Sequence, residues 1–304
     1  MKTREILSRS KVMKSVYLKA NHYFVKALIK TSPTLATKYL HKRVTRKKLN
    51  LKNPVDFNEK LQWLKLYWQH PLVYRCADKY EVRSYIEEAG CPEILNDLYH
   101  VYDRVEAICW DVLPDSFVLK TTNSCGTNII CSKKSELNKD ETISKLRKWM
   151  KIDYSYYAAE LHYSKIIPRI VCEKYLDTEA GFLPNDYKIY CFNGFPKIIL
   201  VATDRAVKLR LFFVDLNWRK IDIGSNKYNL GEPPEKPECL GKMLSYAETL
   251  SKPFPFVRID FYNVNNHPIF GEMTFTPAGN MAMYYNEYGL KLLGDMLTLP
   301  RAIN

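Results

Sequence analysis

Two acidic residues near the end of the chain could hold a divalent cation. Asp260 stands two residues after Arg258, and Glu272 lies in the next stretch of β-forming residues. If the two stretches form an antiparallel hairpin, all three side chains project from one face of it. Magnesium takes few protein carboxylates and completes its coordination with phosphate oxygens, so the pair suits a metal ion bound with a nucleotide. The alternative is an ordinary surface pair of acids beside an arginine.

The stretch Phe117–Ser132 could hold the phosphates of that nucleotide. Lys120 ends a run of β-forming residues, and the loop Thr121–Thr127 that follows is almost entirely small or polar, with a glycine at Gly126. A lysine beside such a loop can neutralise a triphosphate, and the backbone N–H groups can close over it because few side chains stand in the way. An ordinary hairpin with a polar turn is the alternative.

These residues require a scaffold, and the sequence predicts one. Asp56 and Glu59 form a capping box at the start of a helix, and Asn193-Gly194 is the signal of a tight hairpin. Hydrophobic periodicity predicts helices over residues 57–68, 77–89, 140–151, 240–250 and 287–297, and strands over residues 94–102, 117–120, 128–130, 168–176, 187–192, 197–202, 209–214, 218–221, 257–262 and 268–275. Elements in this irregular order predict an α+β fold with mainly antiparallel sheets.

Composition narrows the class of protein. The chain has 304 residues, of which 46% are hydrophobic, and can therefore bury a sizeable core. No apolar run reaches the length of a membrane span, and we expect no secretory signal. The eight cysteines are scattered without a CxxC pair, which favours free thiols in a reducing cytosol over a disulfide framework or a zinc site.

The net charge of +13 is concentrated at the N-terminus. Residues 1–52, the N-terminal arm, contain fifteen Lys and Arg against one acid, so they carry +14 and the other residues sum to −1. Apolar residues recur here at three- and four-residue spacing, which predicts an amphipathic helix that Pro33 ends, followed by the basic cluster His41–Lys48. The stripe comprises Val12, Met13, Val16, Tyr17, Ala20, Tyr23, Phe24, Ala27 and Leu28. The arm could pack on the body, attach to an anionic membrane surface or, least favoured, bind nucleic acid.

The order of these features resembles that of the ATP-grasp superfamily. A lysine before a small-residue loop, an acid-bearing strand, Arg-x-Asp and a glutamate before a Pro-x-Gly turn follow one another. More closely, five stretches resemble the TupA-like ATP-grasp family: residues 57–68, 77–86, 117–128, 185–196 and 271–279. The resemblance covers about residues 50–300 and implies a fold that grips ATP between two α+β units. That family is associated with bacterial surface-glycan gene clusters, teichuronopeptide synthesis among them.

For ATP, the resemblance implies a site built from several segments. Its phosphate contacts would be Lys120 and Lys79, covered by the loop residues Thr121, Ser124, Gly126 and Thr127. The adenine edge would meet the run Glu173-Lys174-Tyr175-Leu176, through the backbone of Lys174 and Leu176 and the side chain of Glu173. Asp186 and Lys188 would face the nucleotide or the transferred phosphoryl group.

For catalysis, the resemblance implies that Arg258 stabilises the charge of the transferred phosphoryl group and that Asp260 and Glu272 hold Mg²⁺. Thr274 stands where many ATP-grasp ligases have an asparagine ligand, and a hydroxyl is a weaker ligand. The loop over the phosphates is also poor in glycine. We expect Asn280 as a substitute metal ligand and Arg205, His162 or Lys165 as contacts to the acceptor.

The resemblance implies an ATP- and Mg²⁺-dependent ligase that activates a carboxylate as an acyl-phosphate and couples it to an amine. Such an enzyme would join an amino acid to a sugar carboxylate, or build a short peptide, on a lipid-linked glycan in the cytoplasm. The N-terminal arm would hold it at the inner face of the plasma membrane. Three alternatives stay open: a phosphotransferase on a sugar hydroxyl, a non-catalytic nucleotide- or glycan-binding subunit, and the least favoured, a nucleic-acid-binding protein.

The resemblance also suggests how the chain is divided. Beyond the N-terminal arm, we expect an N-terminal helical or α+β subdomain over residues 53–110 and a small lid subdomain over residues 111–176. A C-terminal subdomain over residues 177–304 would bind the metal and the nucleotide.

Overall fold

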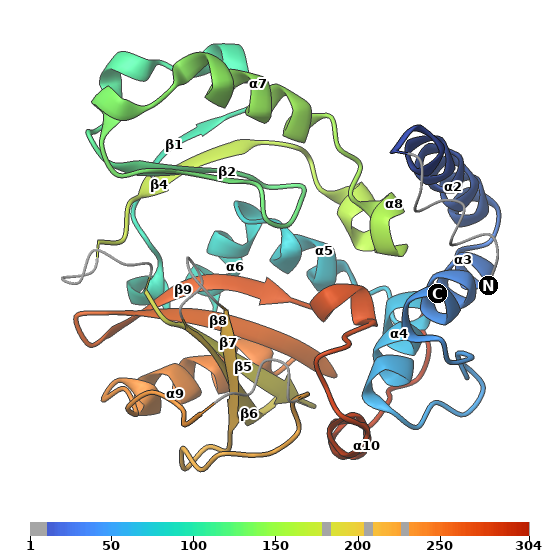
Figure 1. Ribbon diagram of the computed structural model, residues 1–304. Helices are drawn as coiled ribbons and strands as arrows, with labels where there is room; N and C mark the ends of the chain where they lie inside the picture. Colours follow the sequence, from blue (N-terminus) through green and yellow to red (C-terminus); the bar gives the residue numbers. More distant parts are fainter. Residues whose placement is uncertain (1–10, 178–183, 204–208, 226–230, 304) are drawn as a thin grey trace.

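The computed structural model describes residues 11–177, 184–203, 209–225 and 231–303, and its framework is two antiparallel sheets (Figure 1). The small sheet has the strand order β1-β4-β2-β3, and the large sheet has the order β7-β6-β5-β8-β9. The strands are β1 (Leu98–Tyr102), β2 (Phe117–Thr121), β3 (Asn128–Cys131), β4 (Ile170–Lys174), β5 (Asp186–Phe192), β6 (Phe195–Thr203), β7 (Arg210–Val214), β8 (Phe256–Val264) and β9 (His267–Thr274). The predicted α+β fold with antiparallel sheets is confirmed.

The small sheet is covered on one side by α7 (Lys139–Met150) (Figure 1). Phe117 and Leu119 of β2 are fully buried and pack with Leu146 of that helix. Because successive side chains of a strand point to opposite faces, Lys120 of β2 and Glu173 of β4 project from the other side. The small sheet therefore has an apolar face under α7 and a face that carries charge.

The large sheet follows the same rule. The face that carries Cys191 packs on α9 (Leu240–Ser251), where the Cys191 thiol lies 3.8 Å from the carbonyl oxygen of Ala247. On the other face, Tyr190 and Phe256 surround Phe57 of α4 (Phe57–Tyr67), with ring centroids 6.3 Å and 5.2 Å from it. The N-cap half of the predicted capping box at the start of α4 is confirmed, because the Asp56 carboxylate accepts the Glu59 N–H at 2.9 Å. The Glu59 carboxylate accepts the N–H groups of Val55 and Asn50 and not that of Asp56, so the return bond is made one residue earlier.

Local chemistry also confirms several other elements. The helices predicted over residues 140–151, 240–250 and 287–297 are α7, α9 and α10 (Glu287–Met296). Asn193 and Gly194 have φ angles of 50° and 86°, the left-handed values that the tight turn between β5 and β6 requires. The strand predicted over residues 218–221 is wrong, since only an isolated bridge joins Val214 and Lys220.

The helix predicted over residues 77–89 is present only from Glu81, because two helices meet in this region. These are α5 (Pro71–Ala77) and α6 (Glu81–Glu88). The Asp78 carboxylate accepts the N–H groups of Tyr80 and Glu81 at 2.8 Å and 3.3 Å, which turns the chain between them. An aspartate that bonds to the backbone two residues ahead favours a turn over a continuous helix. Lys79 consequently lies in a turn.

The N-terminal arm contains two helices, α2 (Lys11–Thr31) and α3 (Pro33–Thr45). Pro33 ends the first helix as predicted, but it also begins the second, at a position where a missing N–H costs nothing. Val25 and Ile29 of α2 are buried, whereas Tyr23 and Phe24 of the predicted stripe are 69% and 52% exposed. Over residues 20–31, the packed face of α2 thus overlaps the predicted stripe only in part, at Leu28.

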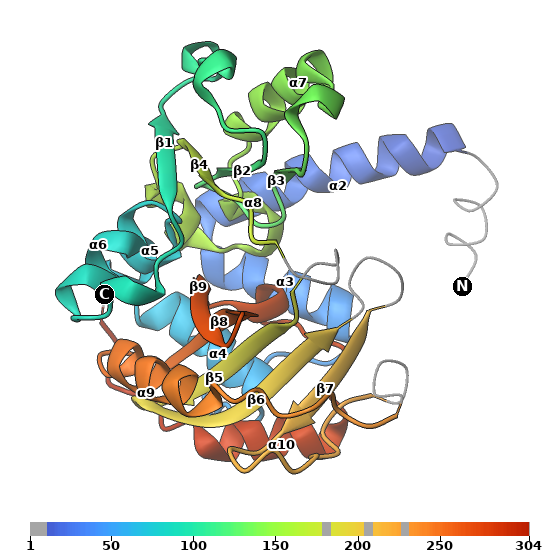
Figure 2. The same cartoon turned by 90° about the vertical axis from the view of Figure 1, so that its left-hand side faces the viewer.

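Figure 2 shows the N-terminal half of α2 extending away from the rest of the molecule. Its C-terminal half packs on α3 and on α8 (Ser155–Ala158). Among the described residues, no helix combines the length and the apolar character that crossing a membrane requires. The subdomain boundaries predicted from the sequence stay predictions.

The packing of α10 on α4 depends on a glycine. A Cβ at Gly294 would lie 2.4 Å from the carbonyl oxygen of Val55, whereas a Cβ at Gly241 in α9 would meet nothing within 4 Å. We expect Gly294→Ala to lower the free energy of unfolding by about 1–3 kcal/mol, because backbone must move. Gly241→Ala should be neutral or raise it by up to about 1 kcal/mol. Urea unfolding of both variants checks this, and equal effects would contradict the packing described.

Candidate active site

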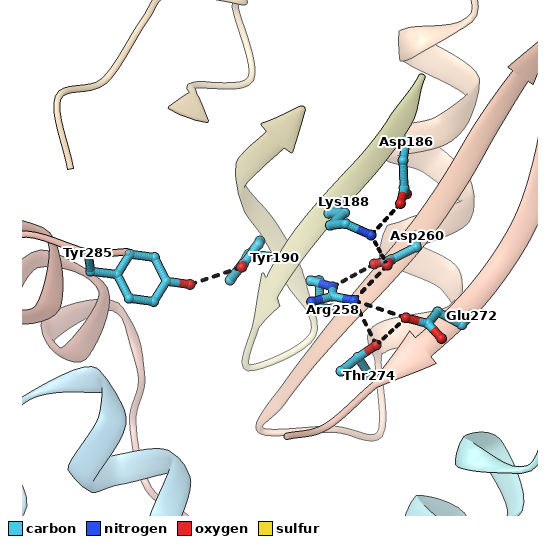
Figure 3. A network of polar contacts seen from close by, with 8 residues as sticks. All are labelled: Asp186, Lys188, Tyr190, Arg258, Asp260, Glu272, Thr274 and Tyr285. Carbon is cyan, nitrogen blue, oxygen red and sulfur yellow. Dashed lines mark hydrogen bonds and ion pairs between the residues drawn. The ribbon is translucent and has the colours of Figure 1, made fainter. Parts of the chain in front are cut away.

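A row of charged side chains crosses three strands of the large sheet (Figure 3). Lys188 of β5 is paired in register with Asp260 of β8, which is paired with Glu272 of β9. Asp186 stands two residues before Lys188, and Arg258 two residues before Asp260, so they share that face. The sequence-predicted hairpin face is therefore present, and a third strand extends it.

Asp260 is the centre of this row. The guanidinium of Arg258 donates from Nε to Oδ1 and from Nη2 to Oδ2 of Asp260, both at 2.7 Å. The Lys188 ammonium donates to Asp260 Oδ2 at 2.6 Å and to Asp186 Oδ2 at 2.5 Å. Burial alone would raise the pKa of Asp260, but Arg258 and Lys188 hold it below its ordinary value. Burial also opposes the charge of Arg258, yet Asp260 raises the Arg258 pKa well above its usual range.

Glu272 is the more accessible of the two predicted metal ligands. Its side chain is 38% exposed, against 3% for Asp260. Arg258 Nη2 donates to Glu272 Oε1 at 3.1 Å and to Thr274 Oγ1 at 3.0 Å, and the Thr274 hydroxyl donates to Glu272 Oε1 at 3.2 Å. Thr274 therefore orients Glu272 and Arg258.

Glu272 offers an open oxygen to a magnesium ion, whereas both oxygens of Asp260 are already bonded to Arg258 and Lys188. Two carboxylates on neighbouring strands supply the hard oxygen ligands that Mg²⁺ takes, with phosphate oxygens to complete its shell. Glu272 Oε2 accepts no hydrogen bond from the described residues. Within the described ranges, no group of three His, Cys, Asp or Glu is arranged around a common point. Arg258 Nη2 bridges the two carboxylates, so positive charge already lies between them.

Lys120 and Glu173 form an ion pair on the charged face of the small sheet. The Lys120 ammonium lies 2.6 Å from Glu173 Oε2, and both side chains are largely buried. Burial acts to lower the pKa of Lys120, but Glu173 and, more weakly, Glu272 raise it overall. The influence of Glu272 shows that the charged faces of the two sheets are within electrostatic reach of each other.

The loop after Lys120 uses its hydroxyl groups internally. Thr121, Ser124 and Thr127 are buried, and their side-chain oxygens lie 2.6–2.9 Å from one another. These hydroxyl groups therefore already bond to one another, and the expectation that the loop covers phosphates stays a prediction. The backbone differs: within the described chain, the N–H groups of Ser124, Cys125 and Gly126 donate to no protein acceptor. Gly126 has a φ of 71°, which favours glycine.

Lys79 ties the α5–α6 turn to this loop. Its ammonium donates to the carbonyl oxygen of Ser124 at 2.5 Å. Burial lowers the pKa of Lys79, and the carboxylate of Glu272 opposes that shift. Lys79, in the α5–α6 turn, thus interacts both with the loop after Lys120 and with Glu272 of the large sheet.

The predicted adenine segment begins in β4 with Glu173 and Lys174 and continues beyond its end. The backbone N–H of Lys174 donates to Asp97 O at 2.9 Å, and its carbonyl accepts from Asn96 Nδ2 at 2.8 Å. These bonds already engage the backbone groups of Lys174 that the resemblance assigns to adenine, and Lys120 engages Glu173. Tyr175 and Leu176 are half-buried.

A cavity of about 300 Å³ adjoins the charged row. Of the predicted site residues, it is lined by Lys79, Arg258, Glu272 and Thr274. Its other wall comes from the segment after α7, with Tyr154, Tyr157, Glu160 and Tyr163, and from Cys125 of the loop. The aromatic composition of residues 154–163 was the signal that could have identified this wall.

A second cavity, of about 410 Å³, has the lining residue Thr276 in common with the first. His162 and Lys165, the expected acceptor contacts, line this second cavity with Lys65 and Trp68. Burial and, to a smaller extent, the positive charge of Lys65 lower the pKa of His162 to about 3. The site is thus divided between two adjoining spaces.

Two further residues belong to the expected site. Asn280 is fully buried, and its Nδ2 donates to Leu61 O of α4 at 2.9 Å. Its Oδ1 has no hydrogen-bond partner among the described residues, and its role as a substitute metal ligand stays a prediction. Arg205 lies outside the described residues.

A model of the TupA-like ATP-grasp family matches residues 59–298. The chain belongs to this family. The predicted ATP-grasp fold is thereby confirmed, and the matched region contains every residue of the charged row, whereas most of the N-terminal arm precedes it. No curated protein matches the chain significantly.

Three solved structures show how far the likeness extends. D-alanine–D-alanine ligase from Bacillus anthracis complexed with ATP is 15% identical, with a TM-score of 0.38 and coverage of 73% of this chain and 57% of that one. D-alanine–D-alanine ligase from Helicobacter pylori is 11% identical, with a TM-score of 0.47 and coverage of 83% and 69%. D-cycloserine synthetase DcsG is 11% identical, with a TM-score of 0.42 and coverage of 74% and 70%. The chain thus spans little more than half of the first of these ligases.

The buried pair of Arg258 and Asp260 yields a stability prediction. Arg258→Met leaves a buried carboxylate short of counter-charge and should lower the free energy of unfolding by roughly 3–5 kcal/mol at pH 7. Arg219→Met is the matched control, because Arg219 also lies 2.7 Å from an aspartate, Asp215, but is 77% exposed. It should cost less than about 1 kcal/mol. Urea unfolding checks both variants, and equal losses would contradict the assignment.

The same pair predicts a pH dependence. Because the folded-state pKa of Asp260 lies below its ordinary value, its stabilising contribution is complete above about pH 4. It is lost as the pH falls through the folded-state pKa. The stability gap between the wild type and Arg258→Met should therefore narrow in acid, and a gap that widens on acidification would contradict this.

Proposed function

We propose that this TupA-like ATP-grasp protein is an ATP- and Mg²⁺-dependent ligase that couples a carboxylate to an amine. One observation carries the proposal. Lys79 and the loop residue Cys125 line the same cavity as Arg258 and Glu272, and Lys79 also donates to Ser124 O of the loop that follows Lys120. Cationic groups on one side and a cation-binding acid on the other are what a nucleotide triphosphate needs.

The loop of the small sheet would bind phosphate through its backbone. The N–H groups of Ser124, Cys125 and Gly126 are available as donors, and Lys79 and Lys120 supply positive charge beside them. Successive free N–H groups in a tight loop form a favourable site for anions. The hydroxyl triangle of Thr121, Ser124 and Thr127 would keep that backbone in shape.

The large sheet would hold the metal ion and the transferred group. Asp260 and Glu272 would bind Mg²⁺, which neutralises phosphate charge when bound. Arg258 lines the cavity and would stabilise the charge that spreads over the phosphoryl group. Lys188 would keep Asp260 oriented, since it already bonds to Oδ2.

The reaction balances without a further reactant. A carboxylate oxygen of the substrate attacks the γ-phosphorus, the bond to ADP breaks, and an acyl-phosphate forms. The amine nitrogen then attacks the acyl carbon, inorganic phosphate leaves with its electron pair, and the amine gives up a proton. Charge stabilisation and positioning by the residues above can supply most of the catalysis.

We also propose the biological setting that the family resemblance implied. The substrates would be an amino acid and a glycan carboxylate during surface-glycan assembly, with the protein held at the inner face of the membrane. The exposed side of α2 supports this attachment, since Tyr23 and Phe24 face solvent in a segment rich in lysine and arginine. Aromatic side chains and basic residues together favour an anionic lipid surface.

Calorimetric titration of Mg²⁺-ATP tests the nucleotide site. We expect micromolar binding by the wild type and at least tenfold weaker binding by Lys120→Met and Glu272→Gln, a loss of about 1.4 kcal/mol or more. Lys133→Met and Glu235→Gln are the matched controls, because both residues are exposed and lie away from the cavity. Unchanged affinity in the first two variants, with thermal unfolding intact, would exclude this site.

Vesicle sedimentation tests the arm. The double variant Tyr23→Ser with Phe24→Ser should bind vesicles of phosphatidylglycerol and phosphatidylcholine at least tenfold less tightly, because each buried aromatic contributes about 1.5–3 kcal/mol. Phe195→Ser with Tyr288→Ser removes two equally exposed aromatic residues elsewhere and should bind as the wild type does. Equal binding by both double variants would refute attachment through α2.

A further inference from the structure

Glu160 is a buried acid that the steps above do not use. It lines the cavity, yet the residue as a whole is only 5% exposed. Its Oε1 accepts the Thr276 hydroxyl at 2.5 Å, and within the described residues its Oε2 accepts no hydrogen bond. Burying a carboxylate without a partner is costly. One oxygen of Glu160 is therefore left for a ligand.

The nearest cation does not neutralise Glu160 directly. Lys65 donates to the carbonyl oxygen of Ala158 at 2.8 Å, and no basic group of the described chain lies within 4 Å of the Glu160 carboxylate. Burial raises the pKa of Glu160 and lowers that of Lys65 to about 8. Both shifts show that neither charge is well solvated, and a cation in the cavity would supply what Glu160 lacks.

The walls beside Glu160 are aromatic. Tyr154 and Tyr163 both line the cavity, and their ring centroids lie 5.0 Å apart. Burial, together with Glu160 and Glu272, raises the pKa of Tyr163 well above its ordinary value. The Tyr163 hydroxyl therefore stays protonated and neutral. Aromatic rings also attract ammonium groups through their faces.

We propose that this cavity binds the amine substrate as its ammonium ion, with Glu160 Oε2 as the anion that holds it and Tyr154 and Tyr163 as walls. The inference rests on the proposed ligase function and names the half of the cavity that takes the nucleophile. Arg258 and Glu272 line the same cavity, so an amine at Glu160 stands beside the group to be activated. A volume of about 300 Å³ suits a small amine such as an amino acid or an amino sugar.

The experiment uses the full chain saturated with Mg²⁺ and a non-hydrolysable ATP analogue, adenylyl imidodiphosphate. L-alanine, L-lysine, ethanolamine and glucosamine are the probes, and L-lactate, ethylene glycol and glucose are hydroxyl analogues of three of them. We expect at least one amine to bind the wild type at least ten times more tightly than its analogue, as measured by calorimetry or saturation-transfer NMR. This comparison needs no variant.

The variant arm compares Glu160→Gln with the exposed control Glu235→Gln. Glutamine keeps the size and the hydrogen bond to Thr276 but removes the charge. Glu160→Gln should weaken amine binding at least tenfold while leaving the affinity for the ATP analogue unchanged, and Glu235→Gln should change neither. If the wild type did not bind the ATP analogue, the ligase function itself would be contradicted. If the wild type binds the ATP analogue but does not prefer any amine to its hydroxyl analogue, the amine site alone would be overturned. The same holds if Glu160→Gln binds the amine as tightly as the wild type does.

Discussion

The pairing of Arg258 with Asp260 is the interaction on which the rest of the site depends. A buried carboxylate is tolerated only when its charge is compensated and its oxygens are bonded, and here Arg258 and Lys188 occupy both oxygens. That requirement fixes the register of β5 against β8, because a shift of one residue would turn Lys188 to the side of α9. The same guanidinium also reaches Glu272 and Thr274 on β9. Three strands are thereby locked into one charged face.

The small sheet also has a charged face, which arises in a different way. Alternate residues of its strands lie under α7, so the residues between them, such as Lys120, point to the opposite face of the sheet. The loop that follows bonds its hydroxyl groups to one another and leaves the N–H groups of residues 124–126 without a protein acceptor in the described chain. In the proposed function, such a loop would bind phosphate through its backbone N–H groups, so small side chains would serve where other phosphate loops have glycines.

The arm and the cavity share a segment. Lys26 of α2 lies over the ring of Tyr156 at 4.7 Å, and the His22 and Tyr157 rings are 6.4 Å apart. Tyr157 and Ala158 also line the cavity, and Ala158 belongs to the apolar cluster that Val25 and Ile29 form with α3. The arm is therefore packed through one face onto the wall of the site, while its opposite aromatic face remains exposed. This helix can therefore pack on the body through one face and contact another surface through the other.

The sequence by itself determined what local chemistry controls. The capping box at Asp56, the Asn193-Gly194 turn and the alternation that puts Arg258, Asp260 and Glu272 on one face all depend on neighbours within a few residues. Only the tertiary structure decided which acid faces the cavity from the other wall, because Glu160 owes its position to Thr276, more than a hundred residues away. It also decided that Asn280 bonds to α4, that Asp78 breaks the predicted helix and that α2 buries Val25 and Ile29. Periodicity identifies an apolar stripe, but which stripe is covered depends on the surface that another part of the chain brings against it.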